Sequence, residues 1–288
     1  MKEDDFNINR FNITIVGLGL VGGSYAMALG KLKPKSIWAV DIDNKALRTA
    51  EELNIIDKGY TDGKIPLNNS DLVIICLYPA LVKKFIEDNI NNFKAGAIIT
   101  DVTGIKTGVI EEINNLLPKN VDFVFGHPMA GREKKGLEYA SAEVFKGANY
   151  IITPNRRNKE KSIKIIETIA KEVGFKSVTK ISPEIHDNAI AFTSQLPHVI
   201  AVALINSDNL GINTGLFIGD SYKELTRIAQ INGDLWTELF IGNKENLVKH
   251  IEIFEKNIKV LKKAIINEER EILQKEFDES SRRRREIS

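Results

Sequence analysis

The sequence predicts an α/β fold in which a mostly parallel sheet domain precedes an all-helical domain. Three observations predict it. Residues 11–41 suggest strand, glycine turn, helix and strand; apolar β-branched runs then alternate with helical patterns up to residue 181; and no convincing strand follows. We therefore expect a Rossmann-type domain at 1–181, a helical domain at 182–277, and a disordered basic tail at 278–288.

The first predicted strand ends in a glycine-rich turn with the sequence GLGLVG. Gly17 permits the tight turn, Gly19 lets the backbone approach a pyrophosphate, and Gly22 lets the next helix pack against the strand. Leu20 lies within the turn, and Ser24 begins the helical pattern that follows, where the N-terminal N–H groups of the helix favour an anion. We expect all five residues to bind a cofactor.

Asp41 stands at the end of the second predicted strand. A carboxylate there accepts hydrogen bonds from ribose hydroxyls and repels a 2′-phosphate. The complete strand–turn–helix–strand–acid order favours NAD over a structural glycine turn or another nucleotide.

The rest of the first domain continues the alternation. Strands are expected at 71–77, 97–102, 122–125, 150–153 and 175–181, and helices at 44–53, 80–90, 106–117 and 159–173. Ligands of such sheets bind beyond the carboxyl ends of the strands, so residues that follow a strand are candidates for a site. His127 is one of them.

The second domain is expected to begin at Ser182-Pro183, an N-cap followed by a proline in the first helical turn. Leu196-Pro197 should kink its first helix. Residues 244–277 are expected to form one long helix with a heptad-like apolar stripe. Packing against the rest of the domain, or against a second copy of it, explains that stripe best.

The composition is that of an ordinary globular enzyme: 43% hydrophobic and 27% charged residues, with a net charge of +1. Such a charge offers no overall field for nucleic acid or an anionic membrane. The single cysteine, Cys76, excludes a disulfide within the chain. The polar N-terminus and the absence of a long apolar stretch lead us to expect a cytoplasmic protein, bound to neither nucleic acid nor membrane. The histidines lack metal-site spacing, so we expect no metal.

Several motifs together resemble those of the prephenate dehydrogenase family, the NAD-dependent enzymes of tyrosine biosynthesis and their arogenate-using relatives. They are GLGLVGGS at 17–24, HPMAG at 127–131, HD at 186–187, TSQLPH at 193–198, and ELTRIA at 224–229 with Trp236. The resemblance implies a Rossmann-type domain followed by a helical dimerisation domain, hence a homodimer. It also implies oxidative decarboxylation of prephenate to 4-hydroxyphenylpyruvate with NAD.

The resemblance assigns roles to single residues. His127 matches the catalytic histidine that hydrogen-bonds the ring hydroxyl of the substrate, and a neutral imidazole suits a base at pH 7. Arg227 matches an arginine that grips a substrate carboxylate. His198 and Ser194 match residues that line the same pocket.

Two further residues belong to the expected substrate site. His186 matches a histidine near the domain interface, and Trp236 is expected to form a wall of the site or to pack behind Arg227. One departure stands out, because family members commonly carry a serine where this chain has Gly104. We expect Thr103 to supply that hydroxyl and to touch the cofactor.

Two alternatives stay open at this point. The chain resembles arogenate dehydrogenases of the same family as much as prephenate dehydrogenases. A nucleotide-binding homologue without catalysis is favoured only by Gly104, while the presence of His127 and Arg227 speaks against it.

Overall fold

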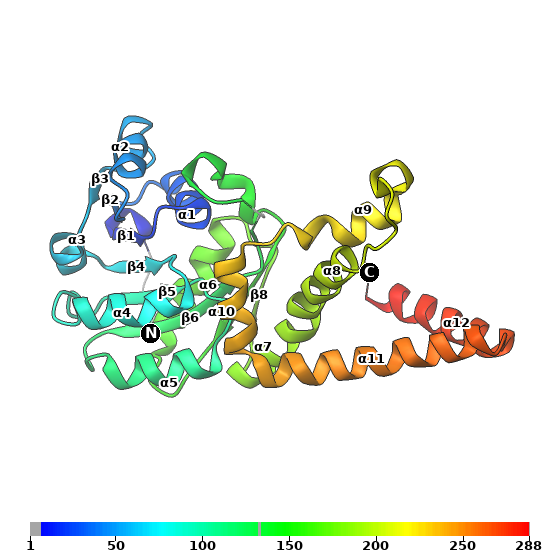
Figure 1. The fold of residues 1–288 in the computed structure, drawn as a ribbon. Coiled ribbons are helices and arrows are strands. Elements are labelled where there is room, and N and C mark those ends of the chain that lie inside the picture. Colours follow the sequence, from blue (N-terminus) through cyan, green and yellow to red (C-terminus); the bar gives the residue numbers. More distant parts are fainter. Residues whose placement is uncertain (1–6, 132–133, 288) are drawn as a thin grey trace.

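The computed structural model describes residues 7–131 and 134–287, which form a sheet domain and a helical domain (Figure 1). Within these residues the sheet has eight strands in the order β3-β2-β1-β4-β5-β6-β7-β8. The strands are β1 Asn12–Val16, β2 Ser36–Val40, β3 Lys58–Tyr60, β4 Leu72–Ile75, β5 Ile98–Asp101, β6 Asp122–Pro128, β7 Asn149–Thr153 and β8 Ser177–Lys180. All neighbours are parallel except the antiparallel pair β6 and β7.

The strand order fixes where a ligand can bind. From β1 the chain adds strands outward on one side as β2 and β3, and it then returns to the other side of β1 with β4. At this reversal the loops after β1 and β4 diverge to opposite faces of the sheet and leave a crevice at its carboxyl edge. The glycine turn after β1 lies at this crevice.

Helices cover both faces of the sheet (Figure 1). They are α1 Leu20–Gly30, α2 Asn44–Glu52, α3 Lys64–Asn69, α4 Pro79–Asn89, α5 Thr107–Leu116 and α6 Glu160–Glu172. Adjacent residues of one strand enter two different cores: Ile74 packs in one, and Val73 and Ile75 in the other. This two-sided burial explains why the strands are continuous apolar runs.

The second domain is helical throughout its described length. Its helices are α7 Pro183–Ile190, α8 Leu196–Asn206, α9 Asp220–Thr226, α10 Gly233–Gly242, α11 Lys244–Ile266 and α12 Arg270–Glu286. Ser182 caps α7 as expected, since its hydroxyl accepts from the Ile185 N–H at 3.4 Å. The expected irregularity before Leu196-Pro197 is a π-helical turn at Ala191–Gln195, which joins α7 to α8.

The two domains meet at the carboxyl edge of the sheet. The Glu238 carboxylate of α10 accepts from the Ala80 N–H of α4 at 3.0 Å, and Asn232 Nδ2 donates to the Tyr78 hydroxyl at 2.8 Å. From this junction α11 runs away from the sheet domain, and α12 folds back alongside it (Figure 1).

The C-terminal region differs from the expected single helix and disordered tail. Helix α11 ends at Ile266, the backbone turns at Glu268 with φ +56°, and α12 then continues through residue 286. The arginine run is helical because acids lie three or four residues from it: Glu279 pairs with Arg282 and Arg283. Hydrogen bonds from these arginines lower the pKa of Glu279 to about 2.

The segment Pro183–Asn206 corrects the expectation that no apolar stretch could span a bilayer. Its 24 residues, with mean hydropathy 1.5, are long and apolar enough by length and composition. It nevertheless contains the π-helical turn, and its Asp187 hydrogen-bonds the first domain. Those features connect the segment to the sheet domain, although only 28% of its most apolar window is buried.

Candidate active site

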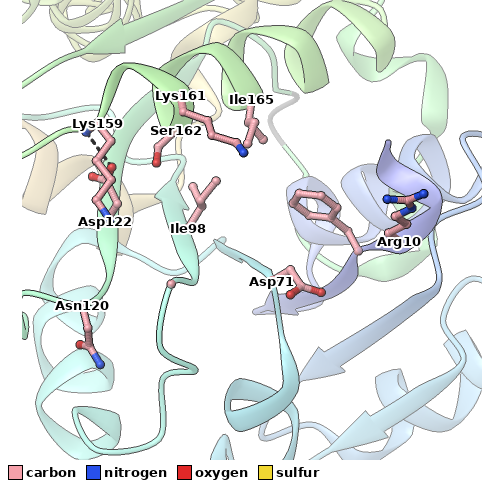
Figure 2. A pocket seen from close by; sticks show the side chains of 11 residues that line it. Arg10, Asp71, Ile98, Asn120, Asp122, Lys159, Lys161, Ser162 and Ile165 are labelled. Carbon is pink, nitrogen blue, oxygen red and sulfur yellow. Dashed lines mark hydrogen bonds between the residues drawn. The ribbon is translucent and has the colours of Figure 1, made fainter. Parts of the chain in front are cut away.

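A cavity of about 410 Å³ lies at the amino ends of the strands, where Asp71, Ile98 and Asp122 line it (Figure 2). Its acids already have structural partners. The Asp122 carboxylate accepts from the Lys159 N–H at 2.8 Å, and Asp71 pairs with Lys94 at 2.5 Å. Ligands of parallel sheets bind at the opposite edge, so we assign no function to this cavity.

A larger cavity of about 680 Å³ lies at the carboxyl edge, between the two domains. The glycine turn and the segments after β4 and β5 form one wall together with the end of β6, while α8, α10 and the π-helical turn form the other. The predicted site residues that line it are Gly19, Leu20, Gly22, Thr103, His127, Ser194, His198 and Trp236. A cavity with walls from both domains is where a cofactor and a second ligand can meet.

The glycine turn leaves room for a ligand at one position only. A Cβ on Gly22 would lie 1.9 Å from the Gly17 carbonyl oxygen, and a Cβ on Gly17 would lie 2.6 Å from the Cys76 carbonyl oxygen. A Cβ on Gly19 would meet nothing within 4 Å. Gly19 is also the N-cap of α1 and makes no side-chain cap, so the helix N-terminus is open to a phosphate.

Asp41 lies at the carboxyl end of β2, as predicted, and its carboxylate is held by two backbone groups. Oδ2 accepts from the Leu18 N–H at 2.6 Å, and Oδ1 accepts from the Asp43 N–H at 2.8 Å. These bonds fix the acid beside the glycine turn, where a ribose would lie.

Ser24 does not have the predicted place. Its side chain is fully buried and does not line the cavity. The hydroxyl donates to the Leu20 carbonyl at 2.7 Å and accepts from the Ser141 N–H at 3.0 Å. Because α1 begins at Leu20, Ser24 lies a full turn inside the helix and connects it to the segment at 141.

His127 lies within β6, not in a loop after it, because the strand continues to Pro128. A buried ion pair grips the residue before it: the Gly126 N–H donates to Asp101 Oδ1 at 3.0 Å, and Lys106 Nζ donates to the Gly126 carbonyl at 2.7 Å. Lys106 Nζ and Asp101 Oδ2 are 2.6 Å apart, and both side chains are fully buried. The backbone that precedes His127 is therefore fixed through both polar groups of Gly126.

The imidazole of His127 is a neutral base. Its Nδ1 lies 2.8 Å from His186 Nε2. Burial, the neighbouring His186 and the Lys106 ammonium together hold the pKa of His127 well below its ordinary value. The ring therefore stays unprotonated at pH 7 and can accept a proton.

His186 lies behind His127, which corrects the expectation that it binds substrate. It is fully buried and does not line the cavity. Its Nδ1 lies 2.7 Å from Asp187 Oδ1, so both of its ring nitrogens are used inside the protein. His186 lies on α7, which packs against β7, α5 and α11.

Thr103 does not supply the hydroxyl that Gly104 lacks. Its Oγ1 donates to the Asp101 carboxylate and accepts from Lys106 Nζ at 3.1 Å. A Cβ built on Gly104, in contrast, would lie 3.7 Å from both Cε1 and Nε2 of His127. Position 104 therefore faces the free side of the imidazole, and position 103 supports the buried ion pair.

The helical wall of the cavity brings three predicted residues together. His198 Nδ1 donates to the Ser194 carbonyl at 2.8 Å, because a carbonyl can only accept. The Trp236 ring stacks on His198, with centroids 3.6 Å apart. These contacts place the three side chains together on the helical wall of the cavity.

Arg227 is exposed on the short 3₁₀ turn Arg227–Ala229 and does not line the cavity, although its neighbours Ile228 and Gln230 do. The cavity wall instead includes Lys134 and Lys135. The grip of Arg227 on a carboxylate stays a prediction.

Sequence reasoning missed several residues of the site. Asp101 ends β5 and Lys106 follows it, so the rule of strand carboxyl ends could have found them. Asn232 carried no such signal. Its Oδ1 is buried and has no hydrogen-bond partner among the described residues, while its Nδ2 donates to the Tyr78 hydroxyl. The described residues hold no group of three or more side chains able to bind a metal.

Comparisons with known proteins agree with this architecture. The prephenate dehydrogenase nucleotide-binding domain matches residues 26–179, and the prephenate dehydrogenase dimerization domain matches residues 182–279. The chain is 28% identical to the prephenate dehydrogenase of Bacillus subtilis, over 94% of this chain and 74% of that one. It is 29% identical to the cyclohexadienyl dehydrogenase of Zymomonas mobilis, over 95% and 94%.

Solved structures give the same result. The crystal structure of prephenate dehydrogenase from A. aeolicus, in complex with hydroxyphenyl propionate and NAD+, is 32% identical with a TM-score of 0.88, over 96% of this chain and 98% of that one. The Synechocystis arogenate dehydrogenase shares the fold, with a TM-score of 0.82 at 24% identity over 96% and 99%. The chain belongs to the prephenate dehydrogenase family.

Proposed function

We propose that this protein oxidatively decarboxylates prephenate to 4-hydroxyphenylpyruvate with NAD. The observation that carries the proposal is that a neutral, partly buried His127 and the glycine turn line the same cavity. A base and a nucleotide site that share one cavity suit a reaction in which a proton and a hydride leave one substrate together.

The cofactor is NAD. Its pyrophosphate fits the open N-terminus of α1, where Gly19 leaves free space, and its ribose fits beside the fixed carboxylate of Asp41. When bound, NAD supplies the nicotinamide ring that accepts the hydride.

The chain's own base does the proton chemistry. His127 Nε2 takes the proton from the ring hydroxyl of prephenate while a hydride leaves the ring carbon that carries this hydroxyl. The bond to the ring carboxylate then breaks, carbon dioxide departs, and the bonding electrons complete the aromatic ring. His127 returns its proton to the phenolate oxygen, so the base is regenerated and no net proton is consumed.

The helical domain holds the substrate. Trp236 and its apolar neighbours cover the ring, and Ser194 with His198 offers polar groups beside it. Arg227 grips a substrate carboxylate with two parallel hydrogen bonds, a geometry that lysine cannot copy. This assignment requires Arg227 to swing into the cavity when the substrate is present.

The working molecule is a homodimer in the cytoplasm, formed through the helical domain. The match to a dimerization domain supports this, and so do the large apolar side chains exposed on the helical domain.

Purified protein with NAD and either prephenate or arogenate, in separate reactions followed by the near-ultraviolet absorbance of NADH, tests the proposal. We expect turnover of prephenate and release of carbon dioxide. Faster turnover of arogenate would reassign the substrate, and turnover of neither would overturn the proposal.

The same assay tests the cofactor. Asp41 should make the protein discriminate strongly against NADP, because its carboxylate repels the 2′-phosphate. Equal kcat/KM with NAD and NADP would remove Asp41 from the ribose site. Asp41→Ser should lower the preference while leaving turnover of prephenate measurable.

A further inference from the structure

The base of the first domain is linked to a carboxylate of the second through two hydrogen bonds. His127 Nδ1 lies 2.8 Å from His186 Nε2, and His186 Nδ1 lies 2.7 Å from Asp187 Oδ1. His186 is fully buried and Asp187 is 3% exposed, so bulk water does not compete for these bonds. The three side chains form an unbroken line from α7 to β6.

The direction of the hydrogen bonds follows from Asp187. Burial raises the pKa of its carboxyl group, but hydrogen bonds from His186 and Thr107 outweigh burial and leave the pKa below its ordinary value. An ionised carboxylate only accepts, so His186 carries a hydrogen on Nδ1, and an imidazole with that hydrogen alone accepts at Nε2. His127 Nδ1 must then donate, which leaves its Nε2 as a bare lone pair on the side that faces Gly104.

We propose that His186 and Asp187 are positioning residues that hold His127 in the one neutral tautomer able to act as the base. The inference rests on the proposed function and adds two residues to it that do not touch the substrate. It also gives the transferred proton a counter-charge: when His127 Nε2 is protonated, His186 connects the new cation to the Asp187 carboxylate.

The same carboxylate joins the domains. Asp187 Oδ1 accepts from the Lys106 N–H at 2.9 Å, and Oδ2 accepts from the N–H and hydroxyl of Thr107 at 2.8 and 2.6 Å. Asp187 of the helical domain therefore caps α5 of the sheet domain while it orients His186. The tautomer of His127 is set only where the two domains are docked.

Variants at position 186 separate positioning from packing. His186→Leu removes the acceptor for His127 Nδ1, and we expect kcat to fall by about ten- to a thousandfold, a smaller loss than the roughly 10²–10⁴-fold contribution of the general base itself. His186→Gln offers an amide oxygen near the position of Nε2 and should recover part of the loss. NAD affinity and the KM for prephenate should stay within about threefold, because neither variant touches a ligand.

Variants around Asp187 supply the matched control. Thr107→Val removes one hydroxyl bond to Asp187 but keeps the backbone bonds, so it should lower the melting temperature slightly and leave kcat unchanged. Asp187→Asn should lower both. It should also move the acidic limb of kcat/KM to lower pH, because losing the Asp187 anion removes a negative charge that favours protonated His127.

Nuclear magnetic resonance of protein labelled with ¹⁵N at its histidines decides the tautomer without any turnover. We expect His127 to carry its hydrogen on Nδ1 in the wild type. A hydrogen on Nε2, or a His186→Leu variant with kcat within twofold of wild type, would overturn the proposal. If the wild type turns over neither substrate, the proposed function fails, and the spectrum still decides the tautomer. If His186→Leu does not fold, His186→Gln and the wild-type spectrum decide.

Discussion

The two domains differ in how completely they bury their apolar residues. In the sheet domain the strands fill two cores, one on each face, and most large apolar side chains are below a tenth exposed. In the helical domain many stay in solvent: Leu216 is 78% exposed, Phe217 71% and Ile265 63%. The sheet domain is complete as one chain, whereas the helical domain has the surface of a molecule that needs a partner.

The difference predicts that the two domains have different roles in the site. Groups that must be held rigidly, such as the glycine turn and His127, lie on the complete domain, where the buried Lys106–Asp101 pair fixes the backbone beside His127. The groups proposed to hold the substrate lie on the domain with fewer buried contacts. Each of the following experiments tests one side of this division.

The largest effect is expected at His127. His127→Asn keeps a hydrogen-bonding side chain but removes the base, so kcat should fall by roughly 10²–10⁴-fold. NAD binding, measured by protein fluorescence, should hardly change. A variant that retains more than about a tenth of wild-type kcat would place the base elsewhere.

Arg227 tests the substrate grip of the helical domain. Losing a hydrogen-bonded charge partner typically costs about 2–5 kcal/mol, so Arg227→Ala should raise the KM for prephenate by roughly thirty- to several-thousandfold. Arg227→Lys should recover only part of this, and NAD affinity should stay constant. A lower melting temperature with an unchanged KM would show instead that Arg227 serves packing.

The exposed apolar residues of α11 allow a test of whether the helical domain binds a second copy of the chain. Ile258 and Ile265 lie seven residues apart on one face and are 47% and 63% exposed. The double variant Ile258→Lys/Ile265→Lys should weaken self-association by at least about tenfold if these side chains are buried between copies. Leu53→Lys, an equally exposed position on the sheet domain, is the control in sedimentation velocity. Equal behaviour of both variants would rule out this stripe as the interface.

Gly104 should show the smallest effect. A Cβ there fits beside the imidazole of His127 and displaces only the end of Leu239, which would lie 3.2 Å away. Gly104→Ser adds a hydroxyl at the free side of the base, and one new hydrogen bond of about 0.5–1.5 kcal/mol should raise kcat a few-fold. Gly104→Ala adds only the methyl group and should not raise it. Equal kcat for both variants would mean that the hydroxyl adds nothing.

The sheet was predictable because its strands are buried on both faces, which produces apolar runs such as LVII in β4. The missed elements lack that signal. Strand β3 is three residues with the sequence KGY and no fully buried side chain, and α3 has six residues and contains Pro66. Such short elements exist because the surrounding sheet and loops hold them, not because of their own residues.

The site was predictable in its backbone where one residue type dictates one conformation, as with Gly17 and Gly22, where a Cβ would collide with a backbone oxygen. It was not where a role depends on neighbours distant in sequence. His186 follows an N-cap and so marks a helix, but nothing in the sequence says that its ring meets His127, 59 residues earlier. Likewise, we expected the Thr103 hydroxyl to replace the missing serine, but it hydrogen-bonds Lys106. The sequence does not reveal that Lys106 is buried beside it.

Because Asp187 caps α5, neither half of this protein can be transplanted as a working module. A sheet domain produced alone would still carry the glycine turn and Asp41, and so the means to hold a dinucleotide. The first turn of its α5 would lack the carboxylate that both caps the helix and orients the base. A chimera that joins this sheet domain to another helical domain therefore needs an acid at this one position before it can become an enzyme.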